Sequence, residues 1–145
     1  MGDTMRWSTK SMLIVDQEDD VVESLRRALH STDYVIFQAR TANEAFCVLT
    51  RMKHPIDFAI IDLDQAGEEG CLFSLIAVLG VHRRATKLIV KTSRRDAPFL
   101  EQVHYCDIDA IILKPISEEQ LVERVRKALH VRCDGPVRTS AGSAA

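Results

Sequence analysis

The chain predicts a doubly wound α/β fold, a (βα)5 sandwich built on a five-stranded parallel sheet. Two sequence periods alternate along its 145 residues: short apolar runs without polar alternation, and longer segments with apolar residues at helical spacing. Runs of the first kind are typical of strands buried on both faces of a parallel sheet. Right-handed crossovers would place the intervening helices on both faces of that sheet.

The first half of the chain holds two strand–helix units. The run Met12–Val15 predicts the first strand, and apolar residues at helical spacing over 21–29 predict the first helix. Tyr34–Phe37 predicts the second strand. Thr41, followed three residues later by Glu44, forms a capping box and so predicts the start of the second helix.

The second half holds three more units. The third, fourth and fifth strands are predicted at Phe58–Ile61, Leu88–Val90 and Ala110–Leu113. Helices are predicted over about 70–79 and about 97–105. Ser117 with Gln120 forms a second capping box, which opens the fifth helix.

Length and composition narrow the class of protein. We expect one domain over 11–131, an amino-terminal extension over 1–10 and a flexible tail or linker start over 132–145. The chain has 19 basic and 21 acidic residues, a net charge of −2, which disfavours a strongly nucleic-acid-binding protein. It has no apolar run as long as a membrane span and no signal-peptide core. The four cysteines form no C-x-x-C pair, so we expect reduced thiols and a cytoplasmic protein.

Polar side chains follow the predicted strands. Asp16 comes after the first strand, Asp62 and Asp64 after the third, Thr92 after the fourth and Lys114 after the fifth. Because ligand sites of such folds lie at the carboxyl ends of the strands, we expect these side chains to lie close together. Paired carboxylates suit Mg²⁺, and a lysine with a hydroxyl can hold the oxygens of a phosphoryl group that a carboxylate attacks. A plainer interpretation of Asp16 is a capping carboxylate for the first helix.

Four motifs carry a resemblance to a known family. They are MLIVDQE at 12–18, DFAIIDLDQAGEEG at 57–70, KLIVKTS at 87–93 and DAIILKP at 109–115. In this order and at these spacings, the chain resembles the receiver domain of two-component response regulators from about residue 11 to 129. The resemblance implies the flavodoxin-like, receiver type of the doubly wound fold.

The resemblance also implies a role for each matching residue. Asp62 would be the phosphoacceptor, with Thr92 and Lys114 binding the phosphoryl group. Asp16, the Asp62 carboxylate and the backbone carbonyl of Asp64 would be ligands of Mg²⁺. The family usually holds the proline at the position of Pro115 in a cis peptide bond.

The sequence departs from the family pattern at several positions. Gln17 replaces the second acidic metal ligand; its amide oxygen can still coordinate Mg²⁺, but one negative charge is gone, so we expect weakened Mg²⁺ binding, with Glu18 as a further candidate ligand. Ile111 stands at the switch position, where an aromatic residue is usual, and a plain buried strand residue is the simpler interpretation. Asp107 replaces a usual glycine and suits a left-handed turn. Arg94 is expected near the mouth of the site, or as a solvated loop residue.

The resemblance implies a signalling protein rather than an enzyme with a separate substrate. A sensor histidine kinase or phosphotransfer protein would phosphorylate Asp62 in the presence of Mg²⁺. The domain would then act on a downstream protein or a missing output domain, without contacting a membrane or nucleic acid itself. The alternative is a degenerate receiver that binds partners independently of phosphorylation, which Gln17 and Ile111 favour. A flavodoxin-like cofactor binder is disfavoured because the acidic loop 16–20 would repel a phosphate.

Overall fold

Strands and helices alternate without exception through the residues that the computed structural model describes, 9–81 and 85–130. The elements are β1 Lys10–Val15, α2 Asp19–Ala28, β2 Tyr34–Ala39, α3 Ala42–Arg51, β3 Phe58–Asp62, α4 Glu69–Gly80, β4 Lys87–Thr92, α5 Ala97–His104, β5 Ala110–Leu113 and α6 Glu118–Leu129. All neighbouring strands are parallel, in the order β2-β1-β3-β4-β5. The predicted fold class is therefore confirmed. The tail predicted over 132–145 lies outside the described residues, as do residues 1–8 of the predicted extension.

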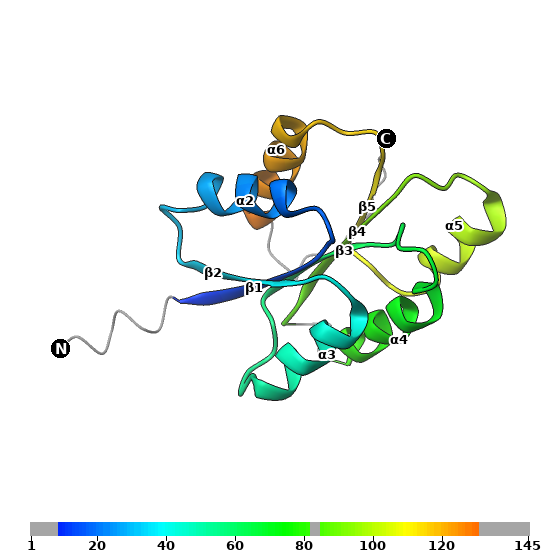
Figure 1. Ribbon diagram of the computed structural model, residues 1–145, viewed down its shortest axis with the longest axis horizontal. Helices are drawn as coiled ribbons and strands as arrows, with labels where there is room; N and C mark the ends of the chain where they lie inside the picture. Colours follow the sequence, from blue (N-terminus) through cyan, green and yellow to red (C-terminus); the bar gives the residue numbers. More distant parts are fainter. Residues whose placement is uncertain (1–8, 82–84, 131–145) are drawn as a thin grey trace.

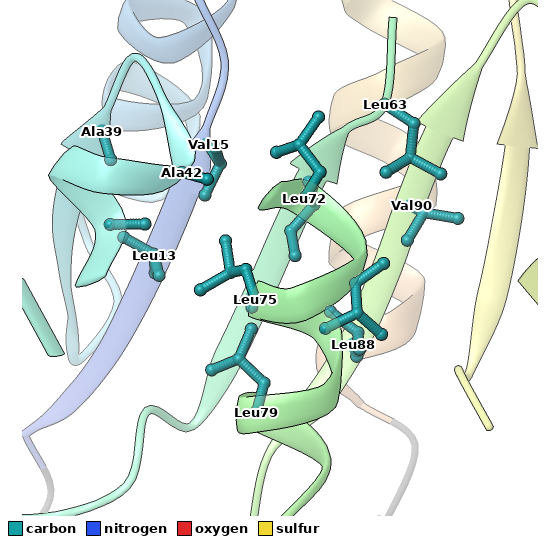
Figure 2. Packing of buried hydrophobic residues seen from close by; sticks show 14 of the residues in the cluster. Leu13, Val15, Ala39, Ala42, Leu63, Leu72, Leu75, Leu79, Leu88 and Val90 are labelled. Atoms are coloured by element: carbon teal, nitrogen blue, oxygen red, sulfur yellow. The ribbon is translucent and has the colours of Figure 1, made fainter. Parts of the chain in front are cut away.

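The helices cover both faces of the sheet, with α2 and α6 on one face and α3, α4 and α5 on the other (Figure 1). Two hydrophobic clusters fill the spaces between these layers. In the larger cluster, Leu72 and Leu75 of α4 lie near Leu88 and Val90 of β4 (Figure 2). In the other, Leu25 of α2 and other residues of α2 and α6 pack on the strands. Burial of these apolar faces supplies the main driving force for folding.

The alternation of side chains along each strand decides which residues reach the candidate site. Ile14 of β1, Ile60 of β3 and Ile89 of β4 belong to the cluster beneath α2 and α6, which we call the α2/α6 face. Because side chains two residues apart share a face, the next positions on these rows are Asp16, Asp62 and Lys91. The rows of the α2/α6 face thus pass from apolar to charged side chains at the carboxyl edge of the sheet.

The helix starts bear out one capping box fully and the other in part. Ser117 accepts a hydrogen bond from the Gln120 N–H, and the Gln120 side chain accepts one from the Ser117 N–H. Thr41 likewise accepts from the Glu44 N–H at 3.1 Å. The Glu44 carboxylate, however, accepts from the N–H of Arg40 instead of Thr41. The second half of that predicted box is therefore wrong, because the carboxylate reaches one residue further back.

Two backbone expectations at the carboxyl end of the chain are confirmed. Asp107 has a φ of 58°, the left-handed conformation expected of the residue that replaces a glycine. The Lys114–Pro115 peptide bond is cis.

Across residues 9–81 and 85–130, none of the helices has the length and apolar character needed to cross a membrane.

Candidate functional site

Four charged side chains meet at the carboxyl edge of the sheet. Asp16 follows β1, Asp62 ends β3, Lys91 lies within β4 and Lys114 follows β5. The register of the sheet makes Asp62 and Lys91 direct neighbours on adjacent strands. Asp16, Asp62 and Lys91 are almost fully buried, with 1%, 5% and 3% of their surfaces exposed. Buried charges of this kind persist only when they are paired and hydrogen-bonded.

Asp16 uses both carboxylate oxygens. Its Oδ1 accepts a hydrogen bond from the backbone N–H of Glu18 at 2.8 Å, next to the start of α2. Its Oδ2 lies 2.6 Å from Nζ of Lys91 in a buried ion pair. Asp16 therefore binds the N–H of Glu18, the residue just before α2, and pairs with a buried cation; it does not cap the first turn of the helix as the plainer interpretation expected.

Asp62 lies between two lysines. Its Oδ2 is 2.7 Å from Nζ of Lys114 and 3.7 Å from Nζ of Lys91. Its Oδ1 accepts a hydrogen bond from the backbone N–H of Asp64 at 2.8 Å. Each carboxylate oxygen of Asp16 and Asp62 therefore faces a donor supplied by the protein.

The Asp64 side chain lies where Thr92, Ser93 and Lys114 converge. Its Oδ1 accepts from the Thr92 hydroxyl at 2.8 Å, and its Oδ2 accepts from the Ser93 N–H at 2.7 Å. Nζ of Lys114 is 3.3 Å from Oδ2. Burial alone would raise the pKa of Asp64, but these hydrogen bonds and the lysine charge together lower it below its ordinary value. Burial opposes the charge of Lys114, yet its carboxylate partners raise its pKa.

Three other residues singled out in the sequence lie around this cluster. Gln17 is exposed, and its Nε2 is 3.4 Å from Oε1 of Gln65. The backbone N–H of Glu18 binds Asp16, and its side chain lines the open groove described below. Ile111 is half-buried and packs against the larger core cluster, beside Val90 in the strand register. A core position of this kind agrees with the simpler interpretation of Ile111.

The Arg94 guanidinium points toward the start of α5. It donates to Asp96 and to Glu69, and lies 4.0 Å from the centre of the Phe99 ring. The Arg94 backbone N–H does reach the site, because it donates to the Thr92 hydroxyl oxygen at 3.1 Å. The side chain is thus held by exposed carboxylates, which agrees with a solvated loop arginine.

Lys91 was not among the residues expected at the site. The sequence did contain a signal for it, since a lysine interrupts the apolar run of β4, a strand buried at every position. Lysine is rarely fully buried unless it is paired. In addition, Lys91 is two residues beyond Ile89 on the same face, so strand periodicity alone directs it toward the acidic cluster.

Comparison with known proteins identifies the family. A family model, the response regulator receiver domain, matches residues 12–126. The chain belongs to this family. It is 28% identical over 121 residues to response regulator GtcR of Aneurinibacillus migulanus, with 83% of this chain and 48% of that protein covered. This receiver domain chain therefore spans about half the length of that curated relative.

Solved receiver domains share the fold. A CheY-like receiver domain protein from Methanospirillum hungatei superimposes with a TM-score of 0.67 at 24% identity, covering 84% of this chain and 94% of that one. A response regulator from Thermotoga maritima gives a TM-score of 0.65 at 24% identity, covering 85% and 99%. At this level of identity the likeness establishes the fold of the receiver domain and no finer property.

Receiver domains generally bind Mg²⁺, but the residues of this one do not fit a divalent ion as they are arranged. Mg²⁺ binds carboxylate oxygens at about 2.0–2.1 Å. Nζ of Lys91 lies beside the oxygens of Asp16 and Asp62 that such an ion would need. In the described parts of the receiver domain, no three His, Cys, Asp or Glu side chains are grouped to hold a metal ion. The ammonium groups of Lys91 and Lys114 lie on these carboxylates instead.

Proposed function

We propose that this receiver domain accepts a phosphoryl group on Asp62 from a sensor histidine kinase or a phosphotransfer protein. The observation that carries the proposal is the pairing of Asp62 with Lys114, at 2.7 Å, at the carboxyl end of β3. A carboxylate can attack phosphorus as a nucleophile and form an acyl phosphate. The neighbouring ammonium group then stabilises the negative charge of the phosphoryl oxygens. The domain would catalyse only the phosphorylation and dephosphorylation of its own Asp62 and would act on no separate substrate.

An open groove gives an anionic donor access to the site. It has a volume of about 460 Å³ and runs between the start of α2 and the start of α6. Its charged lining comprises Lys91, Arg95 and Lys114 with Glu18 and Glu118, and both lysines lie near Asp62. The small excess of positive charge in the lining attracts phosphorylated ligands over distances beyond direct contact.

The transfer would proceed as a displacement at phosphorus. A carboxylate oxygen of Asp62 forms the new P–O bond while the P–N bond to the donor histidine breaks. The electron pair of that bond stays on the imidazole nitrogen, and the ring leaves as neutral imidazole when its other nitrogen carries a proton. The Lys114 ammonium, the Thr92 hydroxyl and the Ser93 N–H, which now donate to the Asp62 and Asp64 carboxylates, would donate to the phosphoryl oxygens.

Gln17 contributes to the same proposal. A neutral amide in place of an acid removes one negative charge, and a unit charge pair at 4 Å is worth about 4 kcal/mol at an effective dielectric of about 20. We therefore expect weaker attraction for Mg²⁺ than a third acid would give.

The signalling surface in this proposal is the face formed by α5, β5 and α6. Tyr105, at the end of α5, is 94% exposed, and Leu113 of β5 is 41% exposed. Exposed aromatic and aliphatic side chains at the edge of a sheet are typical of protein–protein contacts. A downstream protein or an output domain is the partner expected there.

One observation favours a second candidate function, the phosphorylation-independent interaction module. The Asp64 carboxylate already engages the Thr92 hydroxyl, the Ser93 N–H and the Lys114 ammonium. An incoming phosphoryl group must displace this side chain, so the site resists modification. A domain with a permanently filled site would bind its partner constitutively.

Incubation with acetyl phosphate, followed by intact mass spectrometry, separates the two functions. We expect the wild-type protein and an Asp33→Asn control, which changes an exposed acid, to gain the mass of one phosphoryl group. Asp62→Asn should gain none. Absence of any gain in the wild-type protein, or an equal gain in Asp62→Asn, would contradict phosphorylation of Asp62 and support the constitutive module.

A further inference from the structure

We propose that the Lys91 ammonium is the built-in cation of this site and takes the place of a divalent metal ion between Asp16 and Asp62. The inference extends the proposed function, whose acidic site it shares, but it stands on its own observations. It also yields a property that family membership does not supply, namely a receiver site that is complete without Mg²⁺.

The position of Nζ is the first of these observations. It lies 2.6 Å from Oδ2 of Asp16 and 3.7 Å from Oδ2 of Asp62, between the two carboxylates that a metal ion would join. The Lys91 side chain is 3% exposed and the Asp16 side chain 2% exposed. A lysine that is almost fully buried beside two carboxylates forms a buried ion pair, which differs from the weak, solvent-screened pairs of a protein surface.

The backbone of β4 fixes this position. Lys91 is the direct neighbour of Asp62 in the register of β3 and β4, and it faces the α2/α6 side of the sheet as Asp62 does. β4 is an inner strand of the sheet, so its backbone is fixed and only the side-chain rotamers of Lys91 have to be ordered on the acids. The cation is covalently part of the chain and is therefore supplied at any metal concentration.

The charge count of the site is the second observation. Gln17 is neutral, so Asp16 and Asp62 are the two acids at the position where a metal ion would lie. Lys91 pairs with Asp16 and lies near Asp62, and Lys114 pairs with Asp62, so two ammonium groups already balance the two carboxylates. A dication placed beside the Lys91 ammonium would meet electrostatic repulsion in a buried setting, where screening by water is weak.

Calorimetric titration with MgCl₂ tests the inference on the whole chain. We expect no saturable binding at millimolar Mg²⁺ in the wild-type protein. In Lys91→Met we expect saturable binding, with a dissociation constant at least about tenfold below the highest Mg²⁺ concentration at which the wild-type protein binds none. The variant Gln17→Asp/Lys91→Met should bind more tightly still. Lys87→Met is the matched control, because it removes another buried lysine of β4, at the opposite end of the strand, and should gain nothing. Wild-type binding as tight as that of Lys91→Met would overturn the inference.

A second measurement applies if Lys91→Met does not fold. Mn²⁺ added to the ¹⁵N-labelled wild-type protein broadens the amide signals of residues near a bound ion. We expect the signals of Asp16, Gln17 and Asp62 to broaden no more than those of exposed acidic residues such as Asp33. Selective broadening at the three site residues would mean that the metal ion enters the site and displaces the Lys91 ammonium, and would contradict the inference.

Acetyl phosphate in the presence of EDTA separates this inference from the proposed function. Phosphorylation of Asp62 that persists in EDTA supports both the proposed function and the role of Lys91. Phosphorylation that requires Mg²⁺ supports the function and overturns the role of Lys91. No phosphorylation under either condition, together with Mg²⁺ binding gained only by Lys91→Met, supports the role of Lys91 and contradicts the function.

Discussion

Asp64 holds its two carboxylate oxygens on the Thr92 hydroxyl and the Ser93 N–H, with the Lys114 ammonium 3.3 Å away. Two of these three groups, Thr92 and Lys114, are the ones that the family resemblance assigns to the phosphoryl group. The Asp64 carboxylate gives the buried Thr92 hydroxyl an acceptor, while the Ser93 N–H lies at the exposed rim and Lys114 also pairs with Asp62. The side chain of this residue thus has a larger structural role than the backbone carbonyl that the sequence singled out.

Asp64→Asn tests the energetic value of this arrangement. Because the pKa of Asp64 is lowered by folding, its charged form stabilises the protein above its ordinary pKa, and this contribution is lost as the pH falls through the lower folded-state value. Because Asp64 is exposed as a residue and solvent screens its charge, we expect the substitution to lower the free energy of unfolding at pH 7 by about 1 kcal/mol or less. Urea unfolding across a pH series should show the difference from wild type shrinking toward acid pH. A difference that stays constant with pH would contradict this role, and Asp33→Asn is the control.

Lys91→Met tests the buried ion pair. Removing the cation leaves Asp16 buried without its partner, and breaking a buried pair in this way costs about 3–5 kcal/mol. Asp16→Asn/Lys91→Met should recover much of that loss, because no buried charge is then left unpaired. Arg94→Met, which removes an exposed cation that also contacts two carboxylates, should cost far less than Lys91→Met, because solvent screens its ion pairs. Urea unfolding measures all three, and equal losses for Lys91→Met and Arg94→Met would contradict the assignment.

At the level of single elements, the sequence predicted every strand and helix of the described chain. The apolar runs worked as signals because strands buried on both faces need continuous hydrophobic residues, as in β3, where all five residues are buried. Strand ends were less well placed, since Lys87, Lys91 and Thr92 are polar but belong to β4. The paired acids that make Lys91 tolerable lie on other strands, so a search for apolar runs alone could not include it.

The capping box of α6 allows a test at this level. Ser117→Ala removes the acceptor of the Gln120 N–H and should lower the free energy of unfolding by about 0.5–2 kcal/mol. Thr41→Ala at α3 removes an equivalent bond and should cost a similar amount. Thermal unfolding followed by circular dichroism measures both changes. No change for Ser117→Ala would show that the box adds nothing beyond the packing of α6.

Across the whole molecule, the fold brings together residues that are far apart in the sequence. Parallel strands in the order β2-β1-β3-β4-β5 place the ends of β1, β3 and β4 side by side, so that Asp16, Asp62 and Lys91 meet in one buried cluster. The net charge of −2 gives no indication of this arrangement, because acids and lysines gather locally and nearly cancel. The parallel sheet and the gathering of polar residues at its carboxyl edge could be anticipated from the sequence, but the strand order was not predicted. Which oxygen each lysine would bind could not, because it depends on the register and on side-chain packing.

The central claim, a lysine in place of a metal ion, is tested most directly by the ¹⁵N NMR signal of the Lys91 ammonium. A buried, hydrogen-bonded ammonium exchanges its protons slowly with water and gives an observable Nζ signal, which a Lys91→Arg sample would assign by its loss. We expect this signal in the wild-type protein near neutral pH, unchanged by millimolar Mg²⁺ or by EDTA. An Nζ signal that is lost to rapid exchange, or that shifts saturably as Mg²⁺ is added, would contradict the claim.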